Sequence, residues 1–167
     1  GRTGKWFAME HFGVKPDLAT MAKSLQVAAV VGSKKIFPQE DGSISSTFGG
    51  GDVIKMAMGL EIINTIEDDK LLDRCTKTGE YFLKQLRELE SKHSGKIANP
   101  RGLGLLLAFD METSKDANAF VEASFRNGLL TLPCGPKSIR IIPPYIIKEN
   151  EIDEAVGIMS RVLSASG

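Results

Sequence analysis

The chain has 167 residues, of which 42% are hydrophobic and 25% charged, a composition typical of globular proteins that excludes an intrinsically disordered chain. Lysine plus arginine and aspartate plus glutamate number 21 each, so the net charge is zero and the sequence lacks the basic signature of a nucleic-acid-binding protein. No apolar run approaches the roughly 20 residues that cross a bilayer, so we expect no membrane partner. Cys75 and Cys134 match no zinc or redox spacing, so we expect a reducing compartment, the cytoplasm.

The first part of the chain predicts short elements followed by one longer helix. A short helix is expected between Lys5 and Phe12, ended by Pro16-Asp17. The apolar run from Val27 to Ser33 predicts a short buried strand, and a polar loop follows up to Ser46. After "STFGGGD", apolar side chains recur every four residues and predict a helix; they are Ile54, Met58, Ile62 and Ile66.

The remainder alternates helices and strands. An amphipathic helix is predicted from Lys70 to Ser91, then a turn and a strand with Leu105 to Phe109 buried. "SKDANAFVEASFR" predicts a helix that stops at Asn127-Gly128. "LLTLPCG" and "SIRIIPP" predict two strands joined by a Gly-Pro turn, and a last helix begins near Asn150. The alternation predicts an α/β or α+β protein, with a seam between domains at Asp68-Asp69.

Lys23 is a charged residue between small and apolar segments, "PDLATMA" and "SLQVAAVVG". Lysine is rarely buried, so one interpretation is that its stem lies along the protein and its ammonium reaches solvent. The alternative is a reactive amine, because a neutral lysine amine forms a Schiff base with an aldehyde. The local pattern alone leaves both open and favours the first.

Four motifs follow one another along the chain: "GRTGKWFAMEHFGVKPDLATMAK", "STFGGGD", "NPRGLGLLLAFDM" and "KSIRIIPPYIIKENEIDEA". Together they resemble class III (subgroup II) pyridoxal-phosphate aminotransferases. The first motif resembles the family's cofactor-lysine segment, and the second its S/G-T-F-G-G-N element. The third resembles the family's R-G-x-G-L strand, and the fourth its C-terminal R-x-x-P-P-L element. The positions of the first motif that fit the family pattern are Gly1 to Gly4, Glu10, His11, Gly13, Val14, Pro16, Asp17 and Lys23.

The resemblance implies the C-terminal part of a fold-type I pyridoxal-phosphate transferase. Residues 1–69 would be the end of the large cofactor-binding domain, and residues 70–167 a small C-terminal α/β domain. The family's aspartate at the pyridine nitrogen, its N-terminal phosphate loop and its ring-stacking aromatic have no counterpart in this sequence, so we expect this chain alone to be inactive.

Carried over by position, Lys23 would be the catalytic residue bonded to pyridoxal phosphate, and Thr47 would contact the cofactor phosphate. Arg140 would bind a substrate carboxylate. Gln26 would contact substrate, since a glutamine at that position and the absence of the usual glycine-rich turn resemble the lysine 6-aminotransferase and 4-aminobutyrate aminotransferase branch. Gly51 stands where many members have asparagine, so the phosphate loop differs in detail.

Each of these residues also has an ordinary interpretation. Thr47 stands shortly before a helix, where threonine commonly caps, although helix N-termini also suit phosphate. Arg140 could pair with a nearby carboxylate instead of a substrate. Arg101 is interpreted as mainly structural, and His11 and His93 carry no metal-ligand spacing, so no metal site is predicted.

The resemblance therefore implies transamination of an ω-amino acid, 4-aminobutyrate or lysine at its 6-amino group, with 2-oxoglutarate as acceptor. Pyridoxal 5'-phosphate is the implied cofactor, and the implied partners are an amino acid, a 2-oxo acid and a second copy of the chain. The alternatives are an ornithine- or acetylornithine-type aminotransferase, another pyridoxal-phosphate reaction such as racemisation, and a non-catalytic interaction domain that retains the fold.

Overall fold

The computed structural model describes residues 1–40, 43 and 51–165. The chain forms two compact units: one contains residues 7–71, and the other contains residues 1–6 together with the chain from Leu72 onward. We call them the lysine unit and the sheet unit, since the first contains Lys23 and the second a four-stranded sheet. Each is described by itself.

The lysine unit contains a hairpin, two 3-10 turns and one long helix. The turns are η1 (Ala8–Phe12) and η2 (Lys23–Leu25), the antiparallel hairpin pairs β1 (Leu18–Met21) with β2 (Ala29–Gly32), and the helix is α1 (Val53–Asp68). The helix predicted near Phe12 is therefore a shorter 3-10 turn. The prediction of a buried strand at residues 27–33 is wrong in its burial, because Val30 and Val31 are each 38% exposed on a two-stranded hairpin.

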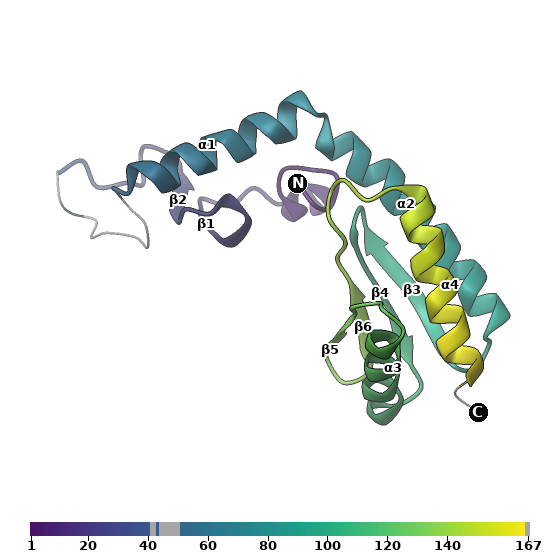
Figure 1. Cartoon of the computed structure of the whole chain (residues 1–167). Coiled ribbons are helices and arrows are strands. Elements are labelled where there is room, and N and C mark those ends of the chain that lie inside the picture. Colours follow the sequence, from purple (N-terminus) through teal and green to yellow (C-terminus); the bar gives the residue numbers. More distant parts are fainter. Residues whose placement is uncertain (41–42, 44–50, 166–167) are drawn as a thin grey trace. The chain divides into compact units, whose positions relative to one another are not determined.

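The sheet unit confirms the predicted α/β fold class. Its four antiparallel strands lie in the order β3-β4-β6-β5, and its helices α2, α3 and α4 pack on one face of the sheet (Figure 1). The bounds are β3 (Ile97–Leu103), β4 (Leu106–Met111), β5 (Leu132–Cys134), β6 (Ser138–Ile141), α2 (Leu71–Lys92), α3 (Ser114–Arg126) and α4 (Glu149–Ala165). All three helices and the β5–β6 pair were predicted from the sequence.

The core lies between the helices and one face of the sheet. On β4, Leu107, Phe109 and Met111 are buried, while the side chains between them are more exposed. Phe109 meets Phe120 of α3 edge to face, with ring centroids 5.5 Å apart. The expectation that Leu105 to Phe109 is buried throughout is wrong at Leu106, which is 41% exposed, because successive strand side chains point to opposite faces.

The segment predicted as a turn before residue 105 is the strand β3, paired with β4 and interrupted by a bulge between Ala98 and Arg101. Asn99 takes a left-handed backbone conformation at this bulge, with φ of 59°. Asn-Pro and Arg-Gly pairs are typical turn residues, so the sequence indicated a turn. Pairing with β4 overrides that local preference, and the bulge accommodates it.

Two helices of the sheet unit are joined by side-chain hydrogen bonds at both ends of their contact. The Tyr81 hydroxyl of α2 donates to Asp153 Oδ1 of α4 at 2.6 Å. His93 Nε2, just after α2, lies 2.8 Å from Ser160 Oγ. None of the helices in the described parts of the chain is long and apolar enough to cross a membrane.

Candidate functional site

The Lys23 turn

Lys23 opens the 3-10 turn η2, and its backbone is left-handed with φ of 57°. Its carbonyl oxygen accepts two hydrogen bonds from Gln26, one from the backbone N–H and one from Nε2, each 3.0 Å long. Gln26 is itself left-handed, with φ of 63°. The structure thus brings these two predicted site residues together, but it joins them through the backbone of Lys23 and leaves the amine free to point outward.

Gly59 of α1 allows the η2 turn to lie against that helix. A Cβ added at Gly59 would stand 2.9 Å from Val27 Cγ1 and 3.3 Å from the carbonyl oxygen of Leu25. Any larger residue would push the chain segment just after Lys23 away from α1. The sequence contained this signal only as a glycine within a helical pattern, which marks a close approach without saying to what.

The Lys23 amine is exposed and has no hydrogen-bond or ion-pair partner among the described residues. An unpaired primary amine at the start of a tight turn is able to form an imine with an aldehyde. Lys23 therefore fits the role of a residue that holds an aldehyde cofactor.

Thr47 lies outside the described residues, as do the predicted Asp41-Gly42 turn and most of the glycine run. The N-cap of α1, considered for Thr47, is Asp52. Its Oδ1 accepts from the backbone N–H groups of Ile54 and Lys55 at 3.1 and 3.2 Å. The hydrogen bond from the Lys55 N–H is the largest of the effects that lower the pKa of Asp52.

The arginine face of the sheet

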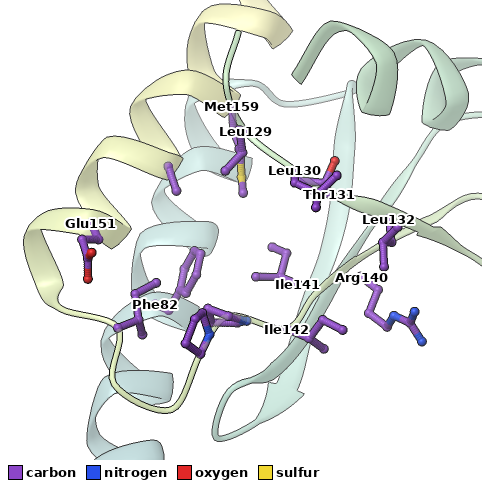
Figure 2. A pocket seen from close by; sticks show the side chains of 14 residues that line it. Phe82, Leu129, Leu130, Thr131, Leu132, Arg140, Ile141, Ile142, Glu151 and Met159 are labelled. Carbon is purple, nitrogen blue, oxygen red and sulfur yellow. The ribbon is translucent and has the colours of Figure 1, made fainter. Parts of the chain in front are cut away.

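Arg140 lies on β6 with its side chain on the face of the sheet opposite the core, since its neighbours Ile139 and Ile141 are buried in that core. Its Nε is buried and has no hydrogen-bond partner among the described residues. Figure 2 shows its guanidinium directed away from the apolar side chains of Ile141 and Met159. Within the described residues, Arg140 forms no ion pair with a carboxylate, in contrast to the ordinary interpretation.

A pocket of about 450 Å³ adjoins Arg140, where the chain before β5 separates from the end of β6. Most of its lining is apolar, from Phe82, Leu129, Ile141 and Met159 (Figure 2). The pocket lies on the core side of the sheet, since Phe82, Ile141 and Met159 belong to the core, whereas the Arg140 guanidinium is on the opposite face.

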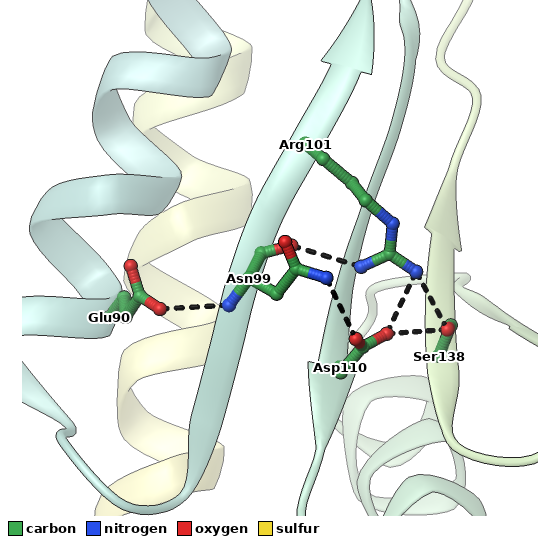
Figure 3. Close-up of polar contacts among 5 residues, drawn as sticks. All are labelled: Glu90, Asn99, Arg101, Asp110 and Ser138. Atoms are coloured by element: carbon green, nitrogen blue, oxygen red, sulfur yellow. Dashed lines mark hydrogen bonds and ion pairs between the residues drawn. The ribbon is translucent and has the colours of Figure 1, made fainter.

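A second arginine, Arg101 on β3, lies in a polar network on the same face (Figure 3). Its Nη2 donates to Asp110 Oδ1 at 2.8 Å and to Ser138 Oγ at 3.0 Å, and its Nη1 donates to the Asn99 carbonyl at 3.0 Å. The structural role expected for Arg101 agrees with these contacts. Asp110, Ser138 and Asn99 were not singled out from the sequence, because only the strand register places them together.

Three of the motifs meet in the sheet unit, although they are far apart in sequence. The Arg2 guanidinium donates to the Pro143 carbonyl and lies over the Tyr145 ring, 4.8 Å from its centroid. The Arg2 carbonyl accepts from the Leu105 N–H at 2.9 Å. Arg2, at the start of the first motif, thus joins the "RGLG" and "IRIIPPY" segments.

Comparison with known proteins

Within the described ranges, one unit has an unpaired primary amine and the sheet of the other has an unpaired arginine, groups suited to binding an aldehyde and a carboxylate. The sequence model of the family described as Aminotransferase class-III matches residues 1–163, and the chain belongs to that family. Class-III aminotransferases depend on pyridoxal phosphate, so the predicted fold, family and cofactor class agree with this match.

Relatives of more than one type are similar to the chain. The acetylornithine aminotransferase of Synechocystis sp. is 38% identical over 98% of the chain and 39% of its own length. The L-lysine-epsilon aminotransferase of Amycolatopsis lactamdurans is 31% identical over 100% of the chain and 38% of its own length. The chain thus spans about two fifths of the length of these relatives.

Solved structures similar to the chain include both of these types and ornithine aminotransferases. A lysine aminotransferase from M. tuberculosis in the internal aldimine form superposes with a TM-score of 0.91, at 27% identity over 98% of this chain and 39% of that one. An acetylornithine aminotransferase from Elizabethkingia anophelis superposes with a TM-score of 0.84, at 31% identity over 98% of this chain and 44% of that one.

Proposed function

We propose that the protein is an aminotransferase that moves the terminal amino group of an ω-amino acid to 2-oxoglutarate, with pyridoxal 5'-phosphate held by Lys23. The observation that carries this proposal is the amine of Lys23, unpaired among the described residues, in its left-handed turn, at the position that the sequence resemblance assigns to the cofactor lysine. Aminotransferases acting on terminal amines, those of lysine and acetylornithine, are similar to nearly the whole chain.

In this mechanism Lys23 and Thr47 hold the cofactor, by its aldehyde and its phosphate respectively. When bound, pyridoxal phosphate supplies an electron sink for the amine-bearing carbon of the substrate. Lys23 Nζ would take the proton from that carbon as a general base and, as a general acid, would donate it to the cofactor instead of back to the same carbon. Gln26 would contact the substrate; its Nε2 donates to the Lys23 carbonyl oxygen, which holds the side chain beside the Lys23 turn.

Arg140 would bind the substrate carboxylate through two parallel hydrogen bonds from its planar guanidinium. Its Nε has no hydrogen-bond partner among the described residues, which supports this role.

The lysine assignment is tested in the protein as its gene encodes it, loaded with pyridoxal phosphate and reduced with borohydride. We expect one labelled peptide, containing Lys23. Lys23→Ala should abolish both the label and transamination, whereas Lys34→Ala, another exposed lysine of the same unit, should keep both. A label on any other lysine in the unsubstituted protein would overturn the proposal.

The amino donor is proposed to be lysine or 4-aminobutyrate, in preference to acetylornithine or ornithine. Gln26 and the lysine aminotransferase superposition favour lysine, whereas the higher sequence identity of the Synechocystis relative favours acetylornithine. Measuring kcat/KM for all four donors with 2-oxoglutarate decides between them. A preference for acetylornithine would contradict the donor assignment and leave the Lys23 assignment intact.

We further propose a cytoplasmic homodimer. Both cysteines are free, which suits a reducing compartment. Helix α1 exposes large apolar side chains, with Val53 76%, Ile54 74% and Leu60 61% exposed, and a second copy would cover such a surface. Light scattering of the protein at micromolar concentration tests this, with a monomer as the contrary result.

A further inference from the structure

We infer that Arg101 is a positioning residue that keeps Arg140 free for substrate, because it occupies the one carboxylate, Asp110, that lies within reach of both arginines in the described part of the sheet face. The inference rests on the proposed role of Arg140 in carboxylate binding. It assigns Arg101 a function in substrate affinity. The polar network in Figure 3 would then affect substrate binding as well as the stability of the fold.

The strand register places Asp110 between the two arginines. Ala108 of β4 pairs with Arg101 on one side and with Arg140 on the other. Asp110 is two residues further along β4, so it points to the same face and is a diagonal neighbour of both. Diagonal neighbours in antiparallel sheets lie about 7–8 Å apart, within reach of a long side chain.

Asp110 pairs with Arg101 alone. Both of its oxygens are occupied: Oδ1 accepts from Arg101 at 2.8 Å and from Ser138 Oγ at 2.5 Å, and Oδ2 accepts from Asn99 Nδ2 at 3.2 Å. The Arg140 guanidinium makes no ion pair among the described residues. Both arginines are thus diagonal to Asp110, with a bulge on the Arg101 side, and only Arg101 is bonded to it.

Asp110 is a carboxylate that would compete with substrate if it were released. Burial raises its pKa, but the hydrogen bonds from Ser138, Arg101 and Asn99 and the charge of Arg101 outweigh burial, and the pKa lies below its usual value. The group therefore stays ionised at neutral pH. Its side chain is only 17% exposed, so water would solvate it poorly without Arg101 and it would attract the nearest remaining cation.

The backbone at the bulge helps to keep Arg101 paired with Asp110. Asn99 is left-handed, its N–H donates to Glu90 Oε1 of α2 at 2.8 Å, and its carbonyl accepts from Arg101 Nη1. The guanidinium of Arg101 is thereby oriented from two sides, by the Asn99 carbonyl and by the Asp110 carboxylate. Arg140 has no comparable set of acceptors.

Removing Arg101 should lower the affinity for a dicarboxylate without removing any group that contacts it. If Asp110 then pairs with Arg140 nine-tenths of the time, the apparent dissociation constant rises about tenfold. We expect Arg101→Met to raise both the KM for 2-oxoglutarate and the Kd for glutarate by about this factor, with kcat little changed.

The double variant separates this role from a structural one. In Arg101→Met/Asp110→Asn the competing charge is gone, so glutarate affinity should return to within about twofold of the original value. Asp110→Asn alone should also keep its affinity. If the network were only structural, the double variant would bind no better than Arg101→Met, and that result would overturn the inference.

Two further measurements complete the test, which uses the pyridoxal-phosphate-loaded protein as its gene encodes it. Thermal unfolding confirms that each variant is folded at the assay temperature. Should Arg101→Met be unfolded, Arg101→Gln replaces it, with the same expected results.

Arg140→Gln should lose glutarate affinity. If it does not, the proposed role of Arg140 fails, and this inference fails with it. If Arg140→Gln loses affinity while Arg101→Met keeps it, only the present inference fails.

Discussion

At the scale of single residues, the Lys23 turn combines two backbone conformations that side chains other than glycine rarely adopt. Lys23 and Gln26 are both left-handed, at φ of 57° and 63°. A left-handed residue costs roughly 1–2 kcal/mol, and such costs are often found at functional sites. The turn persists because Gln26 bonds the Lys23 carbonyl twice, through its main chain and its side chain.

Substitutions of Gln26 should separate these two contributions. Gln26→Ala loses the side-chain bond and keeps the backbone cost, whereas Gln26→Gly loses the same bond and removes most of that cost. We therefore expect Gln26→Ala to be less stable than Gln26→Gly by about 1 kcal/mol in urea unfolding. Equal stability of the two variants would show that the left-handed backbone is not strained here.

At the scale of secondary-structure elements, α2 approaches the β3–β4 connection so closely that neither partner tolerates a side chain. A Cβ at Gly79 would stand 2.2 Å from the carbonyl oxygen of Gly104. Gly104 is itself left-handed, with φ of 51°, and a Cβ there would stand 2.5 Å from the Arg2 carbonyl oxygen. This contact places the "RGLG" motif beside the "GRTG" motif.

A pair of helix substitutions tests that contact. Gly79→Ala should destabilise the protein by about 1–3 kcal/mol, because the backbone of the neighbouring connection must move. Gly157→Ala in α4 is the matched control, since its nearest neighbour would be Arg161 Nη1 at 3.7 Å. It should stabilise by up to about 1 kcal/mol, the usual gain of alanine over glycine in a helix. Urea unfolding of both variants measures the difference, and equal effects would contradict the close approach.

At the scale of the whole molecule, stability should depend on the protonation of His93, which joins the end of α2 to α4. Burial lowers the pKa of His93 below 6.5, and the charges of Lys92 and Lys96 lower it further. The unfolded chain, where the histidine has its ordinary pKa, therefore binds this proton more readily than the folded protein does. The stabilisation is full above about pH 6.5 and decreases as the pH falls below it.

His93→Gln should remove this dependence, because glutamine can still bond Ser160 and does not titrate near neutrality. We expect the free energy of unfolding of the original protein to fall more steeply between pH 7 and pH 5 than that of the variant. His11→Gln, at a half-buried position within η1, serves as the control for replacing a histidine elsewhere. Parallel pH curves for the original protein and His93→Gln would contradict the prediction.

The helices were predictable because their information is local. Apolar residues spaced three and four apart marked α1 and α2, and Asn127-Gly128 marked the end of α3. The same reasoning missed β3, whose local turn residues are overridden by pairing with β4. It also missed the exposure of the β1–β2 hairpin, since an apolar run in the sequence does not indicate whether other elements cover the strand that it forms.

For the candidate site, the order of the motifs along the chain was enough to identify the family. The same order singled out Lys23 and Arg140 as candidates, because the identity and sequence of residues in a motif can be compared without coordinates. Which arginine is paired and which is free was decided only by the folded sheet. Asp110, Arg101 and Arg140 are separated by at least nine residues, and strand register alone makes them neighbours. The reason is physical: hydrogen-bond partners across a sheet depend on alignment between strands, and that alignment is a property of the packed molecule.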